Sequence, residues 1–161
     1  MAMPNKDQWA EIEKLLDRMY CSVYLLCDGY LVEATLRRVA KNNLAIEIYV
    51  NGYIRGEWFG LFDKPEDMSE ETRRFYMPRQ KKKYSAKELK FYEKFYGKRV
   101  CRKKGMYDSW IIPKSHWRSA KSFIAHLKKH NSDIRVICAD EHKARLDLVM
   151  AEQKTEEAAH G

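Results

Sequence analysis

The sequence lacks the short motifs that most often identify an enzyme. Its 161 residues contain no glycine-rich phosphate loop and no nucleophile elbow, and its four cysteines form no C-x-x-C pair. A paired-thiol metal or redox centre is therefore not indicated. We expect neither a cofactor nor a metal. A non-enzymatic role is favoured, although the sequence alone leaves catalysis open.

Long apolar segments are also missing. No apolar run approaches the ~18 residues of a membrane-spanning helix, and no secretory leader opens the chain. We therefore expect a cytoplasmic protein with reduced thiols and no membrane contact. The length predicts one domain over residues 1–152, and the polar residues 153–161 predict a mobile tail. The oligomeric state stays open.

Acidic residues are scarce in one segment, residues 73–104. This segment holds 14 Lys or Arg, seven Phe or Tyr, and only two acids, Glu88 and Glu93. The rest of the chain holds 17 basic and 21 acidic residues, so the net charge of +8 arises locally. A local excess of positive charge favours an anionic partner over a general contribution to solubility.

The basic segment contains a predicted helix over residues 86–96. Ser85 and Glu88 have the spacing of a capping box, and Gly97 is typical of a helix end. Lysines recur at steps of three and four along this helix and form one cationic stripe, which suits phosphate contacts. The predicted phosphate-binding residues are Arg79, Lys81, Lys82, Lys83, Lys87, Lys90, Lys94, Lys98, Arg99, Arg102, Lys103 and Lys104.

The predicted fold is α+β, with an N-terminal helix followed by a four-stranded antiparallel meander. Its two hairpins turn at Asp-Gly, residues 28–29, and at Asn-Gly, residues 51–52. At the second turn, a two-residue connection would set Ile48 opposite Arg55. We therefore expect a three-residue loop with a bulge, which sets Ile48 opposite Ile54 instead.

Helices dominate the prediction outside the meander. An amphipathic helix is predicted over residues 8–19, and the C-terminal half is expected to be mostly helical with one or two short strands. The strand candidates are residues 107–113 and 134–138. Ser115 and Asp140 are expected to cap the two helices that follow these strands.

Aromatic side chains mark a second candidate surface. Tyr24, Tyr49 and Tyr53 lie on one face of the predicted sheet, and Tyr84 precedes the basic helix. Such residues stack on unpaired bases in single-stranded RNA readers, so these four are candidate stacking positions, and Phe75, Tyr76 and Phe91 of the basic segment could stack bases as well. The favoured alternative for the sheet positions is ordinary packing beneath the C-terminal half. We also expect Tyr92 and Tyr96 of the basic helix to point inward, with the lysines outward.

Three catalytic or metal-binding alternatives have little support. His126 and His130 have metal-ligand spacing, but lysines beside them at the helix end repel a cation. Cys101 lies among cations that lower a thiol pKa, yet no paired base accompanies it. Glu88 and Lys90 are spaced as in metal-dependent nucleases, but side chains two apart diverge on a helix.

The sequence therefore predicts a small, non-enzymatic nucleic-acid-binding protein, with DNA and RNA equally open. The alternative is a protein-binding inhibitor or adaptor of the mobile-element type, which docks an acidic partner or blocks a nucleic-acid-processing enzyme. Composition does not separate the two, because Tyr and Arg are favoured at protein interfaces as well. Salt dependence separates them, since only phosphate contacts release condensed counterions.

Overall fold

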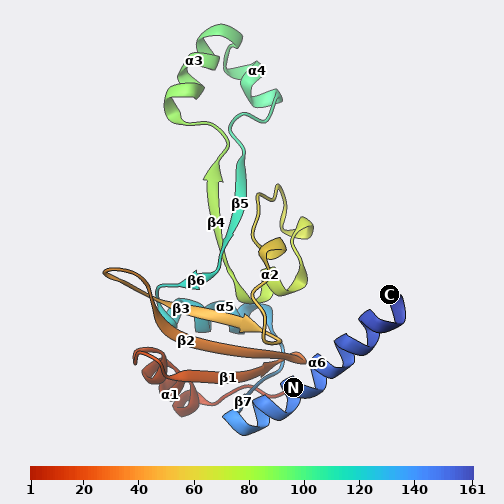
Figure 1. Ribbon diagram of the computed structural model, residues 1–161. Helices are drawn as coiled ribbons and strands as arrows, with labels where there is room; N and C mark the ends of the chain where they lie inside the picture. Colours follow the sequence, from red (N-terminus) through yellow and green to blue (C-terminus); the bar gives the residue numbers. More distant parts are fainter.

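The main sheet of the protein has five antiparallel strands. A computed structural model describes all residues, 1–161, and shows an α+β fold, as the sequence predicts. The strand order is β6-β3-β2-β1-β7 (Figure 1). The strands are β1 (Ser22–Cys27), β2 (Tyr30–Ala40), β3 (Asn43–Val50), β6 (His116–Trp117) and β7 (Ile134–Ile137). The three central strands follow one another in the chain, and both edge strands come from the C-terminal half.

The β1–β2 hairpin turns at Asp28 and Gly29, as predicted. Their φ angles are 47° and 90°, which suits a two-residue turn with both central residues in the left-handed region. Leu25 lies opposite Val32, and both side chains are buried. The turn therefore fixes a register that gathers apolar residues on one face of the sheet.

The predicted fourth strand of the meander does not form, and the predicted three-residue loop is also wrong. Asn51 and Gly52 make a two-residue turn with φ angles of 49° and 80°. Val50 and Tyr53 exchange two backbone hydrogen bonds of 3.0 Å across it. Continuing this register would set charged residues opposite the apolar positions of β3. The chain instead leaves the sheet and forms the 3-10 turn η1 (Gly56–Trp58).

Strand β6 takes the edge of β3 that the missing strand would have covered. Trp117 of β6 is buried, and its indole N–H donates a hydrogen bond to the Phe75 carbonyl at 2.9 Å. This pairing corrects the predicted helix start at Ser115, because Trp117 is held in the sheet. Helix α5 (Ala120–His130) begins after Ser119, whose hydroxyl caps it.

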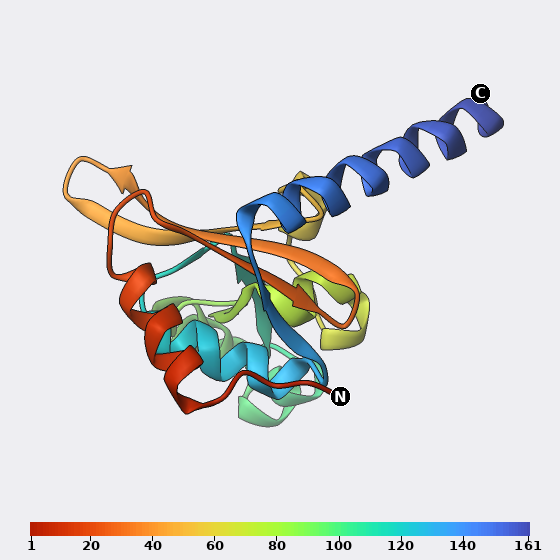
Figure 2. The ribbon, with the colours of Figure 1, turned by 90° about the horizontal axis from the view of Figure 1, so that it is seen from below.

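Helices α1 and α5 pack against each other on one face of the sheet (Figure 2). Helix α1 (Lys6–Leu16) begins and ends two to three residues before the prediction, and Asn5 forms a capping box at its start. Ile12 of α1 and Phe123 of α5 join the apolar face of the sheet in one buried cluster. This cluster is the core of the part that we call the body.

Helix α6 (Ala139–His160) crosses the opposite face of the sheet and extends beyond it (Figure 2). Its cap is Cys138, whose Sγ accepts from the Glu141 N–H at 3.4 Å, and not Asp140 as predicted. Residues 153–160 continue this helix, while the mobility of this end stays a prediction. None of the helices combines the length and the apolar composition needed to cross a membrane.

A two-stranded arm projects from the body and ends in two helices (Figure 1). Its elements are β4 (Met77–Lys82), α3 (Ala86–Tyr96), α4 (Lys98–Lys103) and β5 (Ser109–Lys114), and β4 pairs with β5. We call residues 77–114 the arm and residues 83–108 its tip. The sequence predicts β5 as a strand but not β4, whose residues are mostly polar. The chain reaches the arm from η1 through η2 (Pro65–Asp67) and α2 (Glu70–Phe75).

Candidate nucleic-acid interface

The positive charge of the protein lies on the arm. Residues 77–114 include 13 Lys or Arg and three Asp or Glu, a net charge of +10. The remaining residues include 18 basic and 20 acidic side chains, so the body is close to neutral. The charge excess of the sequence is therefore carried by the part of the fold that projects furthest from the core (Figure 1).

All twelve predicted phosphate-binding residues lie on the arm, and eleven of them are exposed. Three are on β4, three on α3, four on α4, and the other two are Lys83 and Lys104. Lys83 is the exception to this exposure, because its Nζ lies 2.7 Å from Asp63 Oδ1 in the body. This hydrogen bond raises the pKa of Lys83. A phosphate at Lys83 would have to displace Asp63, whereas none of the other eleven cations has a carboxylate partner within 4.0 Å.

Local sequence positions the lysine stripe of α3. The predicted capping box forms: Ser85 Oγ accepts from the Glu88 N–H at 3.3 Å, and Glu88 accepts from the Ser85 N–H at 2.7 Å. Successive residues advance by about 100° around a helix, so Lys87, Lys90 and Lys94 share one side. Glu88 lies on another side, and its hydrogen bonds with Ser85 lower its pKa. The nuclease alternative therefore gains no support, because this carboxylate caps the helix.

The tip has a small aromatic core of its own. Tyr92 of α3 is half-buried between Tyr84 and Tyr96, with ring centroids at 5.5 Å and 6.2 Å. The Tyr107 hydroxyl donates to Glu93 Oε1 at 2.6 Å, and this bond raises the pKa of Tyr107 to about 12. Tyr84, one of the predicted stacking residues, is half-buried in this core, and stacking by Phe75 and Tyr76 is ruled out because both are buried in the body.

Two other residues of the tip bear on the sequence expectations, and one of them, Tyr96, departs from its expectation. Tyr96 is not turned inward, because half of its surface is exposed and the ammonium group of Lys104 lies 4.6 Å from its ring centroid. Cys101 is fully buried, which removes it from solvent and from any substrate. The cations around Cys101 therefore do not make it an accessible nucleophile.

The three predicted stacking residues of the sheet do not form one open surface. Tyr24 packs against His142 of α6 with ring centroids 4.7 Å apart, so packing beneath the C-terminal half is confirmed for this residue. Tyr49 is half-buried under the guanidinium of Arg37, 5.7 Å from its ring centroid, and burial raises its pKa. Tyr53 remains partly exposed beyond the turn after β3. Base stacking by Tyr49 and Tyr53 stays a prediction, and it is separate from the arm.

His126 and His130 lie at the root of the arm rather than in a metal site. They line a cavity of about 450 Å³ together with Arg73, Lys129 and apolar residues of both strands of the arm. The two ring centroids are 4.2 Å apart, and His126 Nε2 donates to the Arg73 carbonyl at 2.9 Å. No group of three His, Cys, Asp or Glu side chains suited to a metal occurs in the protein.

Acidification is expected to destabilise the protein through His126. Burial and the charge of His130 lower the pKa of His126 to about 4, and burial also lowers the pKa values of His130 and His142. Unfolded histidines bind protons near pH ~6.5. Between that pH and about 4 the unfolded state therefore binds more protons, and stability falls as pH falls.

Chemical unfolding at pH 7 and pH 5 measures this effect. We expect a loss on the order of 1–2 kcal/mol, since one pKa unit corresponds to about 1.4 kcal/mol and the His126 and His130 rings remain partly exposed. The variant His126→Gln keeps an N–H donor for the Arg73 carbonyl but does not titrate, so it should lose less stability at pH 5. Equal stability of the wild-type protein at the two pH values would contradict the lowered pKa.

Comparison with known proteins adds no further constraint to this interface. No protein-family model, no curated protein and no solved structure matches the chain. The function is therefore argued from the arm itself.

Proposed function

We propose that this protein is a non-enzymatic nucleic-acid-binding protein whose arm contacts phosphates. One observation carries the proposal: twelve exposed Lys and Arg side chains on the arm, eleven of them predicted phosphate-binding residues, have no carboxylate partner in the fold. Surface cations in folded proteins are usually interspersed with acids, which limits their mutual repulsion. The arm has only three acids, and two of them, Glu88 and Glu93, accept hydrogen bonds from groups of the tip.

Electrostatics favours a polyanion as the partner of such a surface. Cations closer than the Debye length, about 8 Å at physiological salt, raise each other's energy. A chain of phosphates lowers this energy at many positions at once and releases its own condensed counterions. The arm projects from the body, so phosphates can approach most of its cations from the side away from the body (Figure 1), with Lys83 beside Asp63 as the exception. Phosphate contacts alone give affinity but carry no sequence preference.

Protein binding is the second candidate, and the exposed apolar residues of the tip favour it. Val100 of α4 is 39% exposed and Tyr96 of α3 is 50% exposed, both among cations. Such a surface is also suited to an acidic protein groove, as an inhibitor or adaptor would use. Both candidate functions use the arm as the binding surface. They differ in the partner, which is a nucleic acid in the first and an acidic protein in the second.

A capture experiment with and without nuclease tests the proposal. The tagged protein of residues 1–161 is expected to recover nucleic acid from untreated cell lysate, and co-captured proteins should be lost after nuclease digestion. A body variant with Lys14, Lys143 and Lys154 changed to Glu tests whether capture depends on net charge alone. These three lysines are exposed and form no ion pairs. This control should recover as much nucleic acid as wild type. Capture of one protein that survives nuclease digestion, without nucleic acid, would instead support the inhibitor or adaptor.

A further inference from the structure

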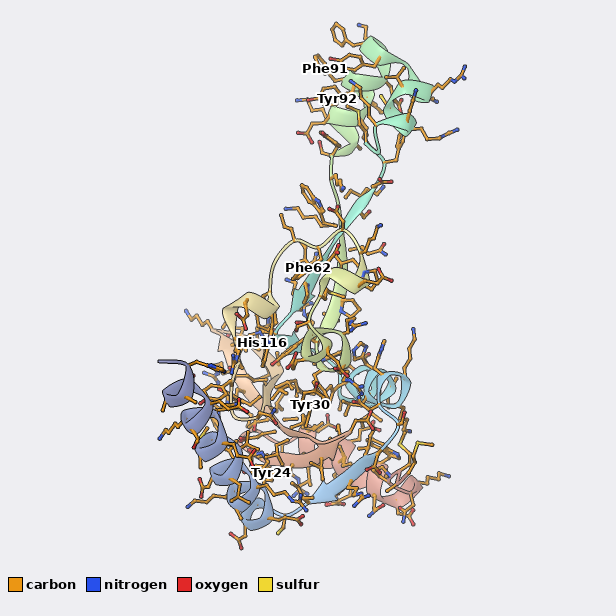
Figure 3. The ribbon with its side chains drawn as sticks, turned by 90° about the vertical axis from the view of Figure 1, so that its right-hand side faces the viewer. Tyr24, Tyr30, Phe62, Phe91, Tyr92 and His116 are labelled. Carbon is orange, nitrogen blue, oxygen red and sulfur yellow. The ribbon has the colours of Figure 1, made fainter.

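Two phenylalanines of α3 are exposed beside the lysine stripe. Phe91 is 57% exposed and Phe95 is 67% exposed, and their ring centroids are 4.7 Å apart. At about 100° per residue, they lie between the stripe and the side of the helix that packs Tyr92 into the tip. Figure 3 shows Phe91 and Tyr92 at the far end of the arm, away from the body.

Folding does not account for these two rings. The tip core contains Tyr84, Tyr92 and the buried Cys101, whereas Phe91 meets Tyr92 only at a steep angle, with centroids 5.6 Å apart. Hydrophobic stabilisation grows with the apolar area removed from water, and most of the area of both phenyl rings stays in water. Exposed apolar rings that lie together are typical of a binding surface.

The neighbouring charges restrict what can cover the rings. A second copy of this surface would bring two lysine stripes within the Debye length of about 8 Å at physiological salt, where they repel. The partner must instead carry negative charges close to flat apolar groups. A nucleic-acid strand has this composition, because each of its nucleotides carries one phosphate and one flat base. The faces of its bases are covered by stacking in a duplex and are free in a single strand.

We infer that Phe91 and Phe95 form a stacking platform for unpaired bases, and that the ligand of the arm is single-stranded nucleic acid. The phosphates of the bound strand lie along Lys87, Lys90 and Lys94. This inference rests on the proposed phosphate binding and adds the class of ligand. It also places base stacking on the exposed side of α3, in preference to the half-buried Tyr84.

Fluorescence anisotropy with labelled oligonucleotides tests the inference. The probes are a mixed-sequence single strand of about 20 nucleotides, longer than the ~4–16 nucleotides that such sites cover, and a duplex of the same length. Changing Phe91 and Phe95 together to Ala should weaken single-strand binding by at least about tenfold, because base stacking on each ring is lost. Duplex binding should change by less than about twofold, since its contacts are to phosphates.

The matched control replaces both phenylalanines by Tyr, which keeps the ring faces and should keep single-strand affinity close to wild type. Because both rings are exposed, circular dichroism should report the same fold for all variants. Equal loss for single strand and duplex, or no loss for either, would overturn the platform while leaving phosphate binding in place. Failure of the wild-type protein to bind either probe at low salt would overturn the proposed function as well. Loss of a captured protein, with single-strand binding intact, would assign the rings to protein docking and also overturn the platform.

Discussion

Removing the tip is expected to abolish nucleic-acid binding and to leave the body folded. In this variant an Asn-Gly turn replaces residues 83–108 and connects Lys82 to Ser109. These two residues are already paired across β4 and β5, so a two-residue hairpin turn fits the ends. The deletion removes nine of the twelve predicted phosphate-binding residues. We expect affinity for nucleic acid to fall by at least roughly a hundredfold.

The body should tolerate this deletion because its core does not extend into the tip. None of the 20 residues of the buried cluster lies between residues 83 and 108. The one ion pair lost is that of Lys83 with Asp63, which is partly exposed and contributes little. The melting temperature should therefore stay within a few degrees of wild type. Binding that survives the deletion would place the phosphate site on the body, and a large loss of melting temperature would show that the tip supports the core.

Features set by a few neighbouring residues could be predicted from the sequence. The capping box of Ser85 with Glu88 and the hairpin turn at residues 28–29 both appear as expected. In each case the relevant hydrogen bonds and backbone angles depend on residues within four positions. The local excess of Lys and Arg is likewise a property of the sequence alone, so the candidate residues of the arm could be named without a fold.

Features set by distant residues could not be predicted. The turn at residues 51–52 is compatible with a further strand. The residues after it are charged at the positions that would face β3, however, and Trp117 of β6 pairs with β3 instead. The mostly polar β4 has no strand pattern and forms because β5 pairs with it. Cys138 caps α6, a role that the sequence interpretation gave to Asp140.

Sequence reasoning could not predict which aromatic residues of the site are exposed. Tyr24 and Phe91 are both aromatic residues in amphipathic segments, yet α6 covers Tyr24 and nothing covers Phe91. The difference arises because the tip has only two helices and no third layer to pack on α3. A signal was present in the sequence, since Phe91 and Phe95 fall next to the lysines on a helical projection.

Reversing the charge of the lysine stripe is expected to have the second large effect. Changing Lys87, Lys90 and Lys94 to Glu shifts the local charge by six units and touches no ion pair of the fold. All three side chains are exposed, so the melting temperature should hardly change. Affinity for nucleic acid should fall by at least about tenfold at physiological salt, irrespective of base sequence, because phosphates are repelled where they were bound.

The body variant with Lys14, Lys143 and Lys154 changed to Glu has the same change in total charge. Comparing the two variants therefore separates the effect of the stripe on binding from the effect of net charge. The deciding measurement is the slope of log affinity against log salt concentration for a single-stranded oligonucleotide. Each lost phosphate contact removes about 0.7 from this slope for single strands. We predict a slope shallower by about two for the stripe variant and an unchanged slope for the body variant. Equal slopes for wild type and the stripe variant would contradict phosphate binding by the stripe of the arm.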